Sequence, residues 1–326
     1  MKIFVIKTNE PYETLAYENI IMNDKDITGD VLVLYQHRKS IIIGNNQNAF
    51  EEINREYVKE NDILVQRRKS GGGAVYHDID NLNFSFISDK SSNNSYQKFL
   101  RPILNFLTSL GLQTEFHGRN DILANGCKIS GNAQYISGDR IVSHGTLLFD
   151  VDMTNLAKAL NPNKIKFESK GIKSVRARVA NINDLLENKM TVDEFRNALV
   201  DYFVKNENST LEEIPYAKYE KQFKEVSELF KSDKWNYDRA ANFTYSNVEK
   251  FPGGLIKVYG EIKDARIVNL IFTGDFLSKK DVREVEPLFK SVRYDEESIL
   301  EILDKIDIES YFGTITKEEL IKIILG

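Results

Sequence analysis

Three consecutive glycines, Gly71 to Gly73, constrain the fold of this chain more than any other feature. They lie in the stretch RRKSGGGAVYHD, directly after an expected strand. Residues without side chains let backbone N–H groups turn toward a bound group without obstruction. Neither Gly-x-x-x-x-Gly-Lys-[Ser/Thr] nor Gly-x-Gly-x-x-Gly occurs around this stretch, so the two common nucleotide-binding loops are not supported. The adjacent Arg67 and Arg68 still favour an anion, and strand alternation predicts that only one of them reaches it.

Length and composition narrow the class of protein. The 326 residues are 41% hydrophobic and 29% charged, which allows a packed core and more than one domain. The net charge of −5 disfavours a nucleic-acid partner, since such proteins are usually basic. The single cysteine, Cys127, suits a reducing cytoplasm. No apolar run predicts a signal peptide or a membrane span, so we expect a soluble cytoplasmic protein without a membrane or nucleic-acid partner.

Hydrophobic periodicity predicts the elements around the glycines. The runs VLVLYQ and SIIIG are expected to form a hairpin with HRK at its turn, and AVYH is expected to pair with NLNFSFIS across DIDN. The stretch NAFEEINREYVKEN is predicted as one helix, and two longer strands are expected to meet at SGDR, residues 137–140. Other helices are expected after Pro11 and over SYQKFLRPILNFLTSLG and TVDEFRNALVDYF.

The pattern of elements changes after Trp235. The stretch from about Asn242 predicts a β-meander with turns that include PGG and KD. Three helical segments follow it, KKDVREVEPLF, EESILEILDKI and KEELIKIIL. Because a run of strands followed by a run of helices indicates a separate α+β unit, we predict a large domain over residues 1–241 and a small domain over residues 242–326.

Several stretches carry a resemblance to a known family, in the same order along the chain. Besides RRKSGGGAVYHD, they are IIIGNNQN (41–48), GRNDI (118–122), KISGNAQY (128–135), HGTLLFD (144–150) and GIKSVRARVANI (171–182). In this set the chain resembles the lipoate–protein ligase family, densely over residues 2–237 and loosely beyond them. One departure is Asp238, where relatives commonly have glycine, and it concerns the junction to the small domain more than the chemistry.

The resemblance implies an α+β fold with a large mixed-sheet catalytic domain, of the type shared with biotin–protein ligases and class II aminoacyl-tRNA synthetases, and a small accessory domain. It implies an enzyme that joins lipoate to ATP, with Mg²⁺, giving lipoyl-AMP and pyrophosphate, and then transfers the lipoyl group to a carrier lysine. The implied carriers are the lipoyl domains of 2-oxoacid dehydrogenase complexes and the glycine-cleavage H protein. We expect a monomer without a prosthetic group.

The resemblance also assigns site residues. Lys128 is the predicted catalytic residue, because activation brings a carboxylate against the α-phosphate of ATP and both anions need a fixed positive charge. The residues expected to bind ATP and the lipoyl-adenylate are Arg68, Ser70, Gly71, Gly72, Gly73, Ala74, Val75, Tyr76, Asn120, Asp121 and Lys128. The residues expected to bind lipoate are Lys128, Arg68, Gly73, His77 and His144. Asp121 is the candidate Mg²⁺ ligand, although one carboxylate does not define a site.

Two other kinds of chemistry stay open at this stage. Cys127 could form a thioester in a lipoyl or octanoyl transferase that makes no adenylate, although alternation should turn it away from the ligand of Lys128. His77, followed by Asp78, or His144 could accept a proton, but no serine nucleophile motif accompanies them.

A third alternative is a DNA-binding regulator of the kind known among biotin ligases. Such proteins carry a helix-turn-helix before the catalytic domain, whereas a strand is expected here from Lys2. The basic segment from Lys164 to Arg178 is predicted either as a solvated loop or as a loop that closes over the adenylate and meets an acidic carrier.

Overall fold

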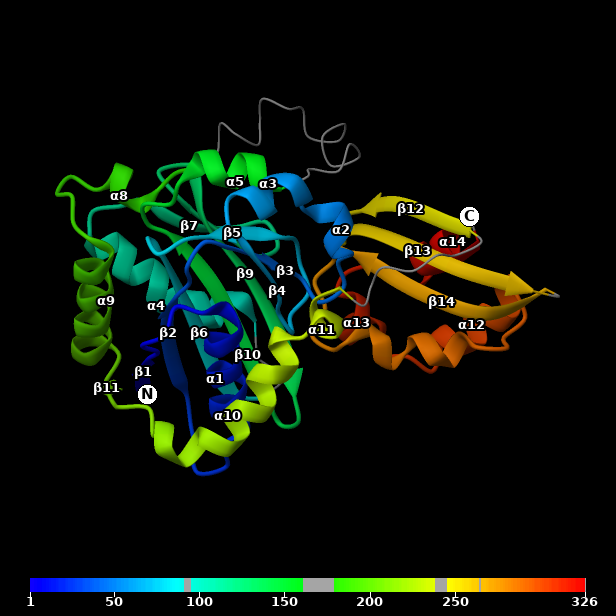
Figure 1. Ribbon diagram of the computed structural model, residues 1–326, viewed down its shortest axis with the longest axis horizontal. Coiled ribbons are helices and arrows are strands. Elements are labelled where there is room, and N and C mark those ends of the chain that lie inside the picture. The colour runs from blue at the N-terminus through cyan, green and yellow to red at the C-terminus, as the bar shows by residue number, and fades with distance from the viewer. Residues whose placement is uncertain (91–94, 161–178, 238–244, 264, 326) are drawn as a thin grey trace.

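The computed structural model describes residues 1–90, 95–160, 179–237, 245–263 and 265–325, and these form two domains side by side (Figure 1). An eight-stranded sheet forms the centre of the large domain. Its strands are, in spatial order, β11 (Thr210–Leu211), β1 (Lys2–Val5), β2 (Val31–Gln36), β6 (Asn81–Asp89), β10 (Arg140–Leu148), β9 (Cys127–Ser137), β8 (Asp121–Ala124) and β7 (Thr114–His117). β1 pairs in parallel with β11 and β2, and the other pairs are antiparallel. The sheet is therefore mixed, and the predicted α+β class is confirmed.

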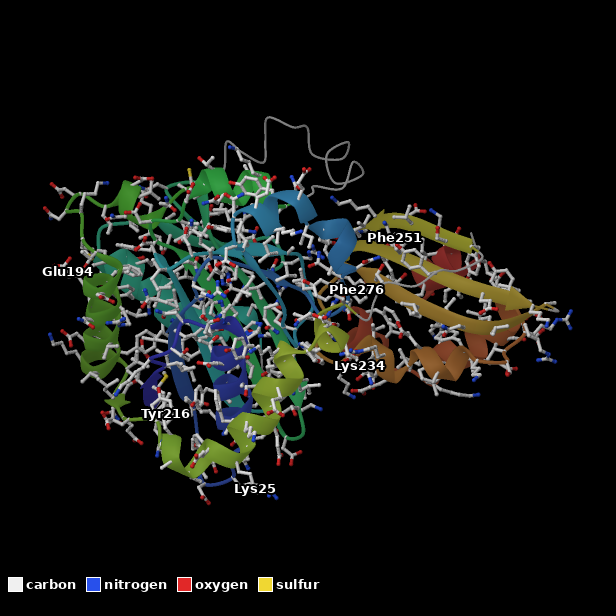
Figure 2. The ribbon with its side chains drawn as sticks, in the orientation of Figure 1. Lys25, Glu194, Tyr216, Lys234, Phe251 and Phe276 are labelled. Atoms are coloured by element: carbon white, nitrogen blue, oxygen red, sulfur yellow. The ribbon has the colours of Figure 1, made fainter. Side chains whose placement is uncertain are left out.

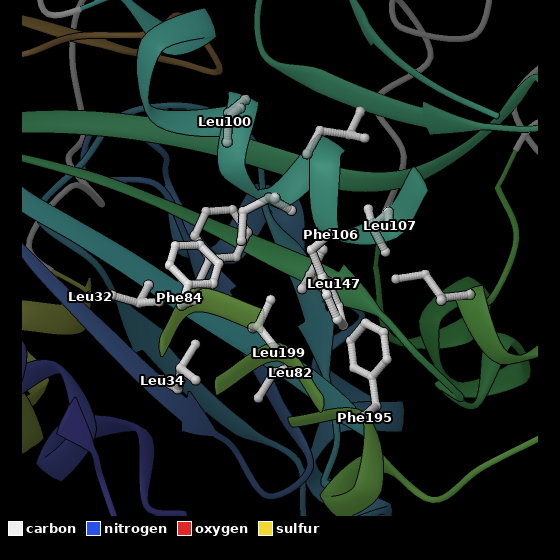
Figure 3. Close-up of a cluster of buried hydrophobic side chains, with 14 of the residues drawn as sticks. Leu32, Leu34, Leu82, Phe84, Leu100, Phe106, Leu107, Leu147, Phe195 and Leu199 are labelled. Carbon is white, nitrogen blue, oxygen red and sulfur yellow. The ribbon is translucent and has the colours of Figure 1, made fainter. Parts of the chain in front are cut away.

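Helices cover both faces of this sheet because its central strands are apolar on both sides. In β2, Leu32 and Leu34 belong to one cluster of buried side chains, and Val31 and Val33 belong to another, as the two-residue period of a strand requires. The helices that contribute to the two clusters are α4 (Tyr96–Ser109) and α9 (Val192–Asn206) on the first face, and α1 (Pro11–Asn23) and α10 (Tyr216–Lys231) on the second. Figure 3 shows the first cluster, in which side chains of α4 and α9 meet those of the sheet.

Local sequence signals set the starts of these helices. α1 begins at Pro11, where a missing N–H costs no helical hydrogen bond. α4 begins after Ser95, whose hydroxyl accepts from the Lys98 N–H. α9 begins with a capping box, in which Thr191 and Glu194 each accept the other's backbone N–H through their side chains. The helices expected at these three places are confirmed.

A second sheet of three strands leads into the glycine segment. Its strands are β4 (Leu64–Arg67), β3 (Ser40–Ile43) and β5 (Val75–His77), with β3 in the middle. Both hairpins expected upstream are therefore wrong, because β2 and β3 lie in different sheets and β5 pairs with β3 instead of β6. A short polar turn between apolar runs is a local signal, whereas the choice of partner strand depends on packing between distant segments.

The single helix expected over NAFEEINREYVKEN is also wrong. It is split into α2 (Ala49–Glu52) and α3 (Arg55–Glu60). The Asn54 side chain accepts from the Tyr57 N–H and so caps a new helix, and Ile53 forms a β-bridge with Leu160. The remaining described helices of the large domain are α5 (Met153–Ala159), α8 (Ile182–Leu185) and α11 (Asp233–Tyr237). The expected strand pair joined at residues 137–140 is confirmed as β9 and β10.

The small domain places helices against one face of an antiparallel sheet. Its strands are β12 (Tyr245–Phe251), β13 (Gly254–Lys263) and β14 (Arg266–Gly274), which confirms the predicted meander. The segments after the sheet are two 3₁₀ turns, η1 (Val282–Glu284) and η2 (Glu286–Phe289), and the helices α12 (Glu296–Leu303), α13 (Ile308–Phe312) and α14 (Lys317–Leu325). They enclose a core of their own around Phe272, Phe289 and Phe312.

The two domains meet along the glycine segment. The Gly72 N–H donates to the Phe276 carbonyl at 3.0 Å, the Gly274 N–H donates to the Asn46 carbonyl at 2.9 Å, and the Ile136 N–H donates to the Lys279 carbonyl at 2.7 Å. Figure 2 shows Phe276 at this junction. The predicted domain boundary at residues 241 and 242 falls in the stretch 238–244, outside the described residues. None of the helices in the described ranges is long and apolar enough to cross a membrane.

Candidate functional site

The turn of the glycine segment requires glycine at one of its own positions and at one position after β3. Gly72 has a φ of +91°, which other residues rarely adopt. A Cβ on Gly44 would lie 2.0 Å from the Gly72 carbonyl oxygen. The end of β3 therefore packs directly against the glycine segment. Both this contact and the positive φ of Gly72 determine the shape of the loop.

Arg68 holds this turn together from inside. Its Nε donates to Ser70 Oγ at 3.0 Å, its Nη1 donates to the Ile42 carbonyl at 3.0 Å, and its Nη2 donates to the carbonyls of Gly71 at 2.6 Å and Gly73 at 2.9 Å. Burial lowers the pKa of Arg68 to about 10, so the guanidinium stays charged at neutral pH. Most of its donors therefore shape the loop, and the positive charge lies directly behind the glycines.

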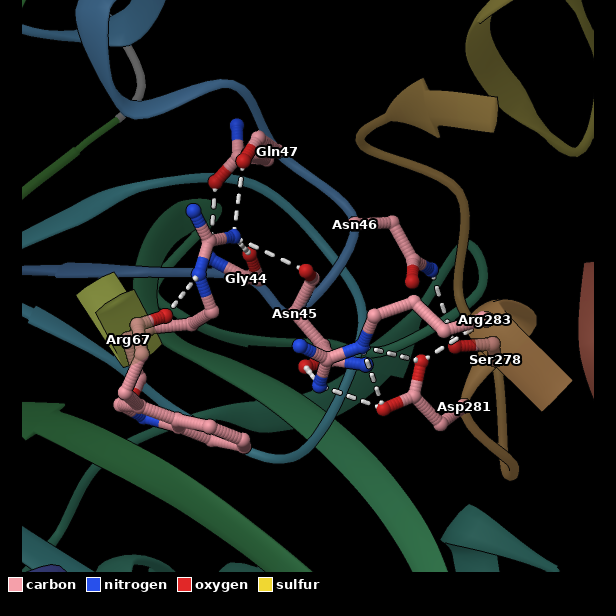
Figure 4. A network of polar contacts seen from close by, with 9 residues as sticks. Gly44, Asn45, Asn46, Gln47, Arg67, Ser278, Asp281 and Arg283 are labelled. Atoms are coloured by element: carbon pink, nitrogen blue, oxygen red, sulfur yellow. Dashed lines mark hydrogen bonds and ion pairs between the residues drawn. The ribbon is translucent and has the colours of Figure 1, made fainter. Parts of the chain in front are cut away.

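Arg67 points the other way, as strand alternation predicts. Its guanidinium is fully buried and donates to the carbonyls of Gly44, Asn45, Gln47, Trp235 and Asn236. Figure 4 shows this network beside the Arg283–Asp281 pair of the small domain. Only Arg68 of the two arginines is thus available to the site.

A buried chain of hydrogen bonds connects Arg68 to helix α1. Ser70 Oγ accepts from Arg68 Nε at 3.0 Å and also forms a hydrogen bond with His144 Nε2, at 2.6 Å. His144 Nδ1 donates to Glu18 Oε2 at 3.0 Å. Burial would raise the pKa of Glu18, but the charge and hydrogen bond of His144 and the hydroxyls of Ser85 and Tyr135 outweigh burial and lower it. A charged carboxylate therefore ends the chain Arg68–Ser70–His144–Glu18.

A second buried pair joins His37 and His77, whose Nδ1 atoms are 3.0 Å apart. Thr14 donates its hydroxyl to the Pro11 carbonyl and so accepts from His37 Nε2, at 2.6 Å. His37 Nδ1 then carries the lone pair and His77 Nδ1 carries the proton. Burial lowers the pKa of His37 to about 3 and that of His77 well below its usual value. Both rings are neutral at neutral pH, so His77 is a poor base for an ammonium proton.

Lys128 lies on β9 at an irregularity in its pairing with β8. Ile122 is opposite Ser130 and Leu123 is opposite Lys128, so β9 has one residue more than β8 between these pairs. Such bulges redirect side chains and are common beside active sites. Lys128 Nζ lies 2.7 Å from Asp121 Oδ1. The Lys128 carbonyl accepts from the Ala180 N–H at 3.1 Å, which ties the strand to the chain after residue 178.

These elements enclose a cavity of about 270 Å³, here called the site cavity. The structure brings together in its wall most of the residues that the sequence predicted: Arg68, Gly72, Gly73, Ala74, Val75, His77, Asn120, Asp121, Lys128 and His144. Three predicted residues lie behind this wall. Ser70 is buried between Arg68 and His144, and Gly71 packs against Phe276 and Ser278. Tyr76 is buried among the apolar side chains around β3 and lines a second, adjoining cavity.

A larger second cavity, of about 690 Å³, adjoins the site cavity. The residues that line both cavities are Ala74, Val75, Asp121, Lys128, Gly131 and Thr146. Its far wall is aliphatic, with Leu148, Leu156 and Val179. Lys128 therefore lies where the two cavities meet.

The basic segment from Lys164 to Arg178 lies outside the described residues.

Sequence reasoning missed several residues of the site cavity. His37 of the N-terminal part and Asp275 and Leu277 of the small domain line it, and Glu18 is buried behind it, next to His144. The signal for Glu18 was a lone carboxylate on the buried side of α1, because a buried acid needs partners. Nothing local marked Leu277, since its position depends on how the domains pack.

Two family profiles match the chain. That of the lipoyl protein ligase A/B catalytic domain matches residues 10–204, and that of the bacterial lipoate protein ligase C-terminus matches residues 240–324. The chain belongs to the lipoate–protein ligase family. This ligase is 42% identical over 322 residues to the lipoate-protein ligase LplJ of Bacillus subtilis, with 97% of each chain covered. The enzyme class predicted from the sequence is confirmed.

Solved structures of lipoate ligases resemble this ligase over most of its length. P. falciparum LipL1 in complex with lipoate has a TM-score of 0.84 and 26% identity, and covers 100% of this chain and 98% of its own. A lipoate-protein ligase A bound with ATP has a TM-score of 0.63 and 28% identity, over 73% and 99%. The bi-partite ligase of Thermoplasma acidophilum, described with its E2 lipoyl domain, has a TM-score of 0.63 and 29% identity, over 75% and 98%.

Proposed function

We propose that this ligase activates lipoate with ATP to give lipoyl-AMP and pyrophosphate, and then transfers the lipoyl group to a lysine of a carrier protein. The observation that carries the proposal is the position of Lys128 on the wall shared by the site cavity and the second cavity. In this reading the acyl acid occupies the site cavity and the nucleotide occupies the second cavity. Relatives with bound lipoate and bound ATP support both ligands.

The first step needs positive charge between two anions. The lipoate carboxylate attacks the α-phosphorus of ATP, an acyl–phosphate bond forms, and pyrophosphate leaves. Lys128 Nζ is the group that stabilises the crowded oxygens, since a mobile point charge with three donors can follow them as the bond forms. Arg68 contributes a second charge from behind the glycine turn, and the backbone of Ala74 and Val75, which line both cavities, offers N–H and C=O groups to the nucleotide.

Asp121 holds the ammonium of Lys128 at the shared wall before the ligands arrive. Among the described residues no group of three or more His, Cys, Asp or Glu side chains could hold a metal ion. Mg²⁺ that arrives with ATP takes most of its ligands from phosphate and water, so a single carboxylate, that of Asp121, fits such an ion. When bound, Mg²⁺ would neutralise phosphate charge. Asn120 lies next to Asp121 in the same wall of the site cavity.

The second step transfers the acyl group. The carrier amine attacks the lipoyl carbonyl, an amide bond forms, AMP leaves with the bonding electrons, and the amine loses a proton. The neutral His37–His77 pair supplies no proton acceptor strong enough for an ammonium. We propose that the carrier amine arrives unprotonated or loses its proton to the departing AMP phosphate. We propose lipoyl domains of 2-oxoacid dehydrogenase complexes and the glycine-cleavage H protein as carriers, which the relative described with an E2 lipoyl domain supports.

The alternative of a transferase through a Cys127 thioester gains no support from the geometry. Cys127 precedes Lys128 on β9 but is not among the residues that line the site cavity or the second cavity. The test is pyrophosphate release by the purified chain with ATP, Mg²⁺ and lipoate. We expect release that depends on lipoate and needs no carrier. Folded protein that releases none, but acylates a carrier from a preformed thioester donor, would replace this function with the transferase.

A further inference from the structure

The wall of the site cavity carries three cations, and the proposed function uses only two of them. They are Arg68, Arg119 and Lys128. Lys128 Nζ is paired with Asp121, and Arg68 uses its donors chiefly to hold the glycine turn. Arg119 takes no part in either half-reaction as proposed so far. It is therefore a charge at the site that has no assigned role.

The Arg119 guanidinium keeps most of its donors unused. Arg119 is exposed, and it lies in the turn that precedes β8. Among the described residues its one hydrogen-bond partner is the Gly253 carbonyl of the small domain, which accepts from Nη1. No carboxylate within the described ranges forms an ion pair with it. Because a guanidinium carries several N–H donors in a planar fork, the others stay available to an anion.

The small domain holds this guanidinium through a turn that is itself tightly packed. Gly253 lies between β12 and β13, and a Cβ on it would lie 2.6 Å from Ile315 Cγ1 and 2.8 Å from Ile315 N. Ile315 is buried in the core of the small domain. The place of the Gly253 carbonyl is therefore fixed by that core. Since a carbonyl carries no net charge, the contact positions Arg119 without neutralising it.

Arg119 extends a row of charged side chains that begins at Lys128. Lys128 Nζ lies 2.7 Å from Asp121 Oδ1, and Arg119 precedes Asp121 by two residues. All of them line the site cavity, but only Lys128 and Asp121 also line the second cavity. Arg119 instead lines a third cavity, of about 360 Å³, between the two domains, here called the interdomain cavity. The row therefore runs from the boundary with the second cavity to a cation at the domain junction.

The activation of lipoate needs a cation in such a place. With the nucleoside in the second cavity and the α-phosphate at Lys128, the β- and γ-phosphates need a third direction, away from the nucleoside and from the acyl acid. The leaving oxygen departs roughly in line with the attacking one, and negative charge grows on it as it leaves. A guanidinium can bind phosphate oxygens through two parallel N–H donors and stabilise that charge.

We propose that Arg119 binds the β- and γ-phosphates of ATP and stabilises pyrophosphate as it leaves, with the Gly253 carbonyl as the contact that positions the guanidinium. The proposal rests on the function proposed above. No bond is made or broken at Arg119. The oxygen that bridges the α- and β-phosphorus takes the bonding electrons and departs with pyrophosphate, and the guanidinium keeps its protons. Lipoyl transfer, which releases AMP and no pyrophosphate, does not use Arg119.

The test measures the two half-reactions separately, with the full chain and variants of Arg119. In Arg119→Ala we expect kcat/KM for ATP in lipoate-dependent pyrophosphate release to fall about 10- to 100-fold, the usual effect of losing hydrogen bonds to a charged group. Inhibition by added inorganic pyrophosphate should weaken by a similar factor. Lipoyl transfer from synthetic lipoyl-AMP to an apo lipoyl domain should keep the rate of the parent.

Two conservative variants separate a role of the charge from a merely structural role. Arg119→Lys keeps the positive charge, whereas Arg119→Gln keeps an N–H donor for Gly253 and loses the charge. We expect Arg119→Lys to recover part of the lost kcat/KM for ATP, and Arg119→Gln to resemble Arg119→Ala. Arg101→Ala is the matched control, because Arg101 is exposed on α4 and lines neither the site cavity nor the interdomain cavity.

The outcomes distinguish this inference from the function on which it rests. If the parent releases pyrophosphate and Arg119→Ala or Arg119→Gln does so with the same kcat/KM for ATP, the inference is overturned. An equal loss of lipoyl transfer and pyrophosphate release would show a structural role and also overturns it. If the parent releases none with lipoate, the proposed function fails, and the inference fails with it. If Arg119→Ala does not fold, Arg119→Lys and Arg119→Gln decide, and equal activities there overturn the inference.

Discussion

Lys128 Nζ and Asp121 Oδ1 are 2.7 Å apart at the wall shared by two cavities, and both side chains are partly exposed. Lys128 is 37% exposed, and pairs with that much access to solvent contribute only about 0–1 kcal/mol to stability. The pair therefore positions the Lys128 side chain and contributes little to the stability of the fold. Asp121 keeps the Lys128 ammonium at the bulge of β9, where an arriving anion can replace Asp121 as its partner.

Replacing Lys128 should remove adenylation while leaving the fold intact. We expect Lys128→Ala to lower lipoate-dependent pyrophosphate release by about 10²-fold or more, the usual effect of deleting one charge-stabilising group. Its melting temperature should stay within about 2 °C of the parent, as expected for a partly exposed pair. Lys25→Ala is the matched control, because Lys25 is exposed and lines neither the site cavity nor the second cavity. A Lys128→Ala enzyme with most of its activity would contradict the role proposed for this residue.

The glycine turn offers a comparison between two glycines of similar backbone. Gly72 has a φ of +91° and Gly111 has a φ of +89°. Alanine at either position should cost about 1–2 kcal/mol of backbone strain. At Gly72 the Cβ would also lie 2.9 Å from Arg68 Nη2, whereas at Gly111 nothing lies within 4 Å. We expect Gly72→Ala to lose at least tenfold in pyrophosphate release by displacing Arg68, and Gly111→Ala to lose stability alone. Equal activity in the two variants would refute this reading.

The chain from Glu18 to Arg68 predicts a graded response at Glu18. Glu18→Gln keeps an oxygen that can accept from His144 Nδ1, whereas Glu18→Leu leaves that donor buried and unpaired. The unfolding free energy of Glu18→Leu should therefore lie about 1–3 kcal/mol below that of Glu18→Gln. Urea denaturation measures this difference. We further expect Glu18→Leu to raise the KM for lipoate more than the KM for ATP, because Arg68 lies behind the glycine turn of the site cavity.

The His37–His77 pair predicts a loss of stability in mild acid. Both pKa values are lowered in the folded state, chiefly by burial, so the unfolded chain binds more protons once the pH falls below about 6.5. Stability should therefore decline as the pH falls from 6.5 toward 3, where His37 titrates in the folded chain. Each ring contributes up to about 1.4 kcal/mol per pH unit.

A variant without titratable rings checks this explanation. Between pH 7.5 and pH 5, the parent should lose about 2–4 kcal/mol more unfolding free energy than His37→Gln/His77→Gln, measured by urea denaturation at both pH values. If the parent and the double variant lose the same amount, the acid sensitivity has another origin. The comparison uses differences between pH values, so a constant cost of the substitutions cancels.

Arg67 should matter for stability and for the attachment of the small domain. Arg67→Ala would leave carbonyls of Gly44, Asn45 and Trp235 buried without their donor, at a cost of at least about 3 kcal/mol. The guanidinium of Arg283, in the small domain, lies over the Trp235 ring, 5.1 Å from its centroid. Limited proteolysis should therefore separate the two domains of Arg67→Ala faster than those of the parent. An unchanged cleavage rate would show that Arg67 does not support the junction.

The sequence predicted the parts of this structure whose signals are local. The helices α4 and α9, the meander of the small domain and the strand pair β9 and β10 all follow from short patterns. The alternation of Arg67 and Arg68 also held, since the period of a strand is geometric. These features depend on neighbouring residues and therefore survive without knowledge of the rest of the chain.

The features that sequence reasoning missed are set by contacts between distant segments. β2 and β3 lie in different sheets because β1 and β6 occupy both edges of β2. Ser70 was expected to face the nucleotide, but it is used to join Arg68 to His144. Leu277 entered the site through the packing of a domain that lies about 200 residues later in the sequence. Propensity and periodicity carry no information on such pairings.

The edge of the large sheet has a consequence for the order in which the chain folds. Lys2 on β1 pairs with Thr210 on β11, so this contact closes a loop of most of the large domain. While the chain emerges from the ribosome, β1 can pair with β2 early, but its outer edge stays open until residue 211 has been synthesised. An open strand edge can recruit another chain. The nascent large domain is therefore most vulnerable to aggregation during that interval, and a short β11 is enough to end it.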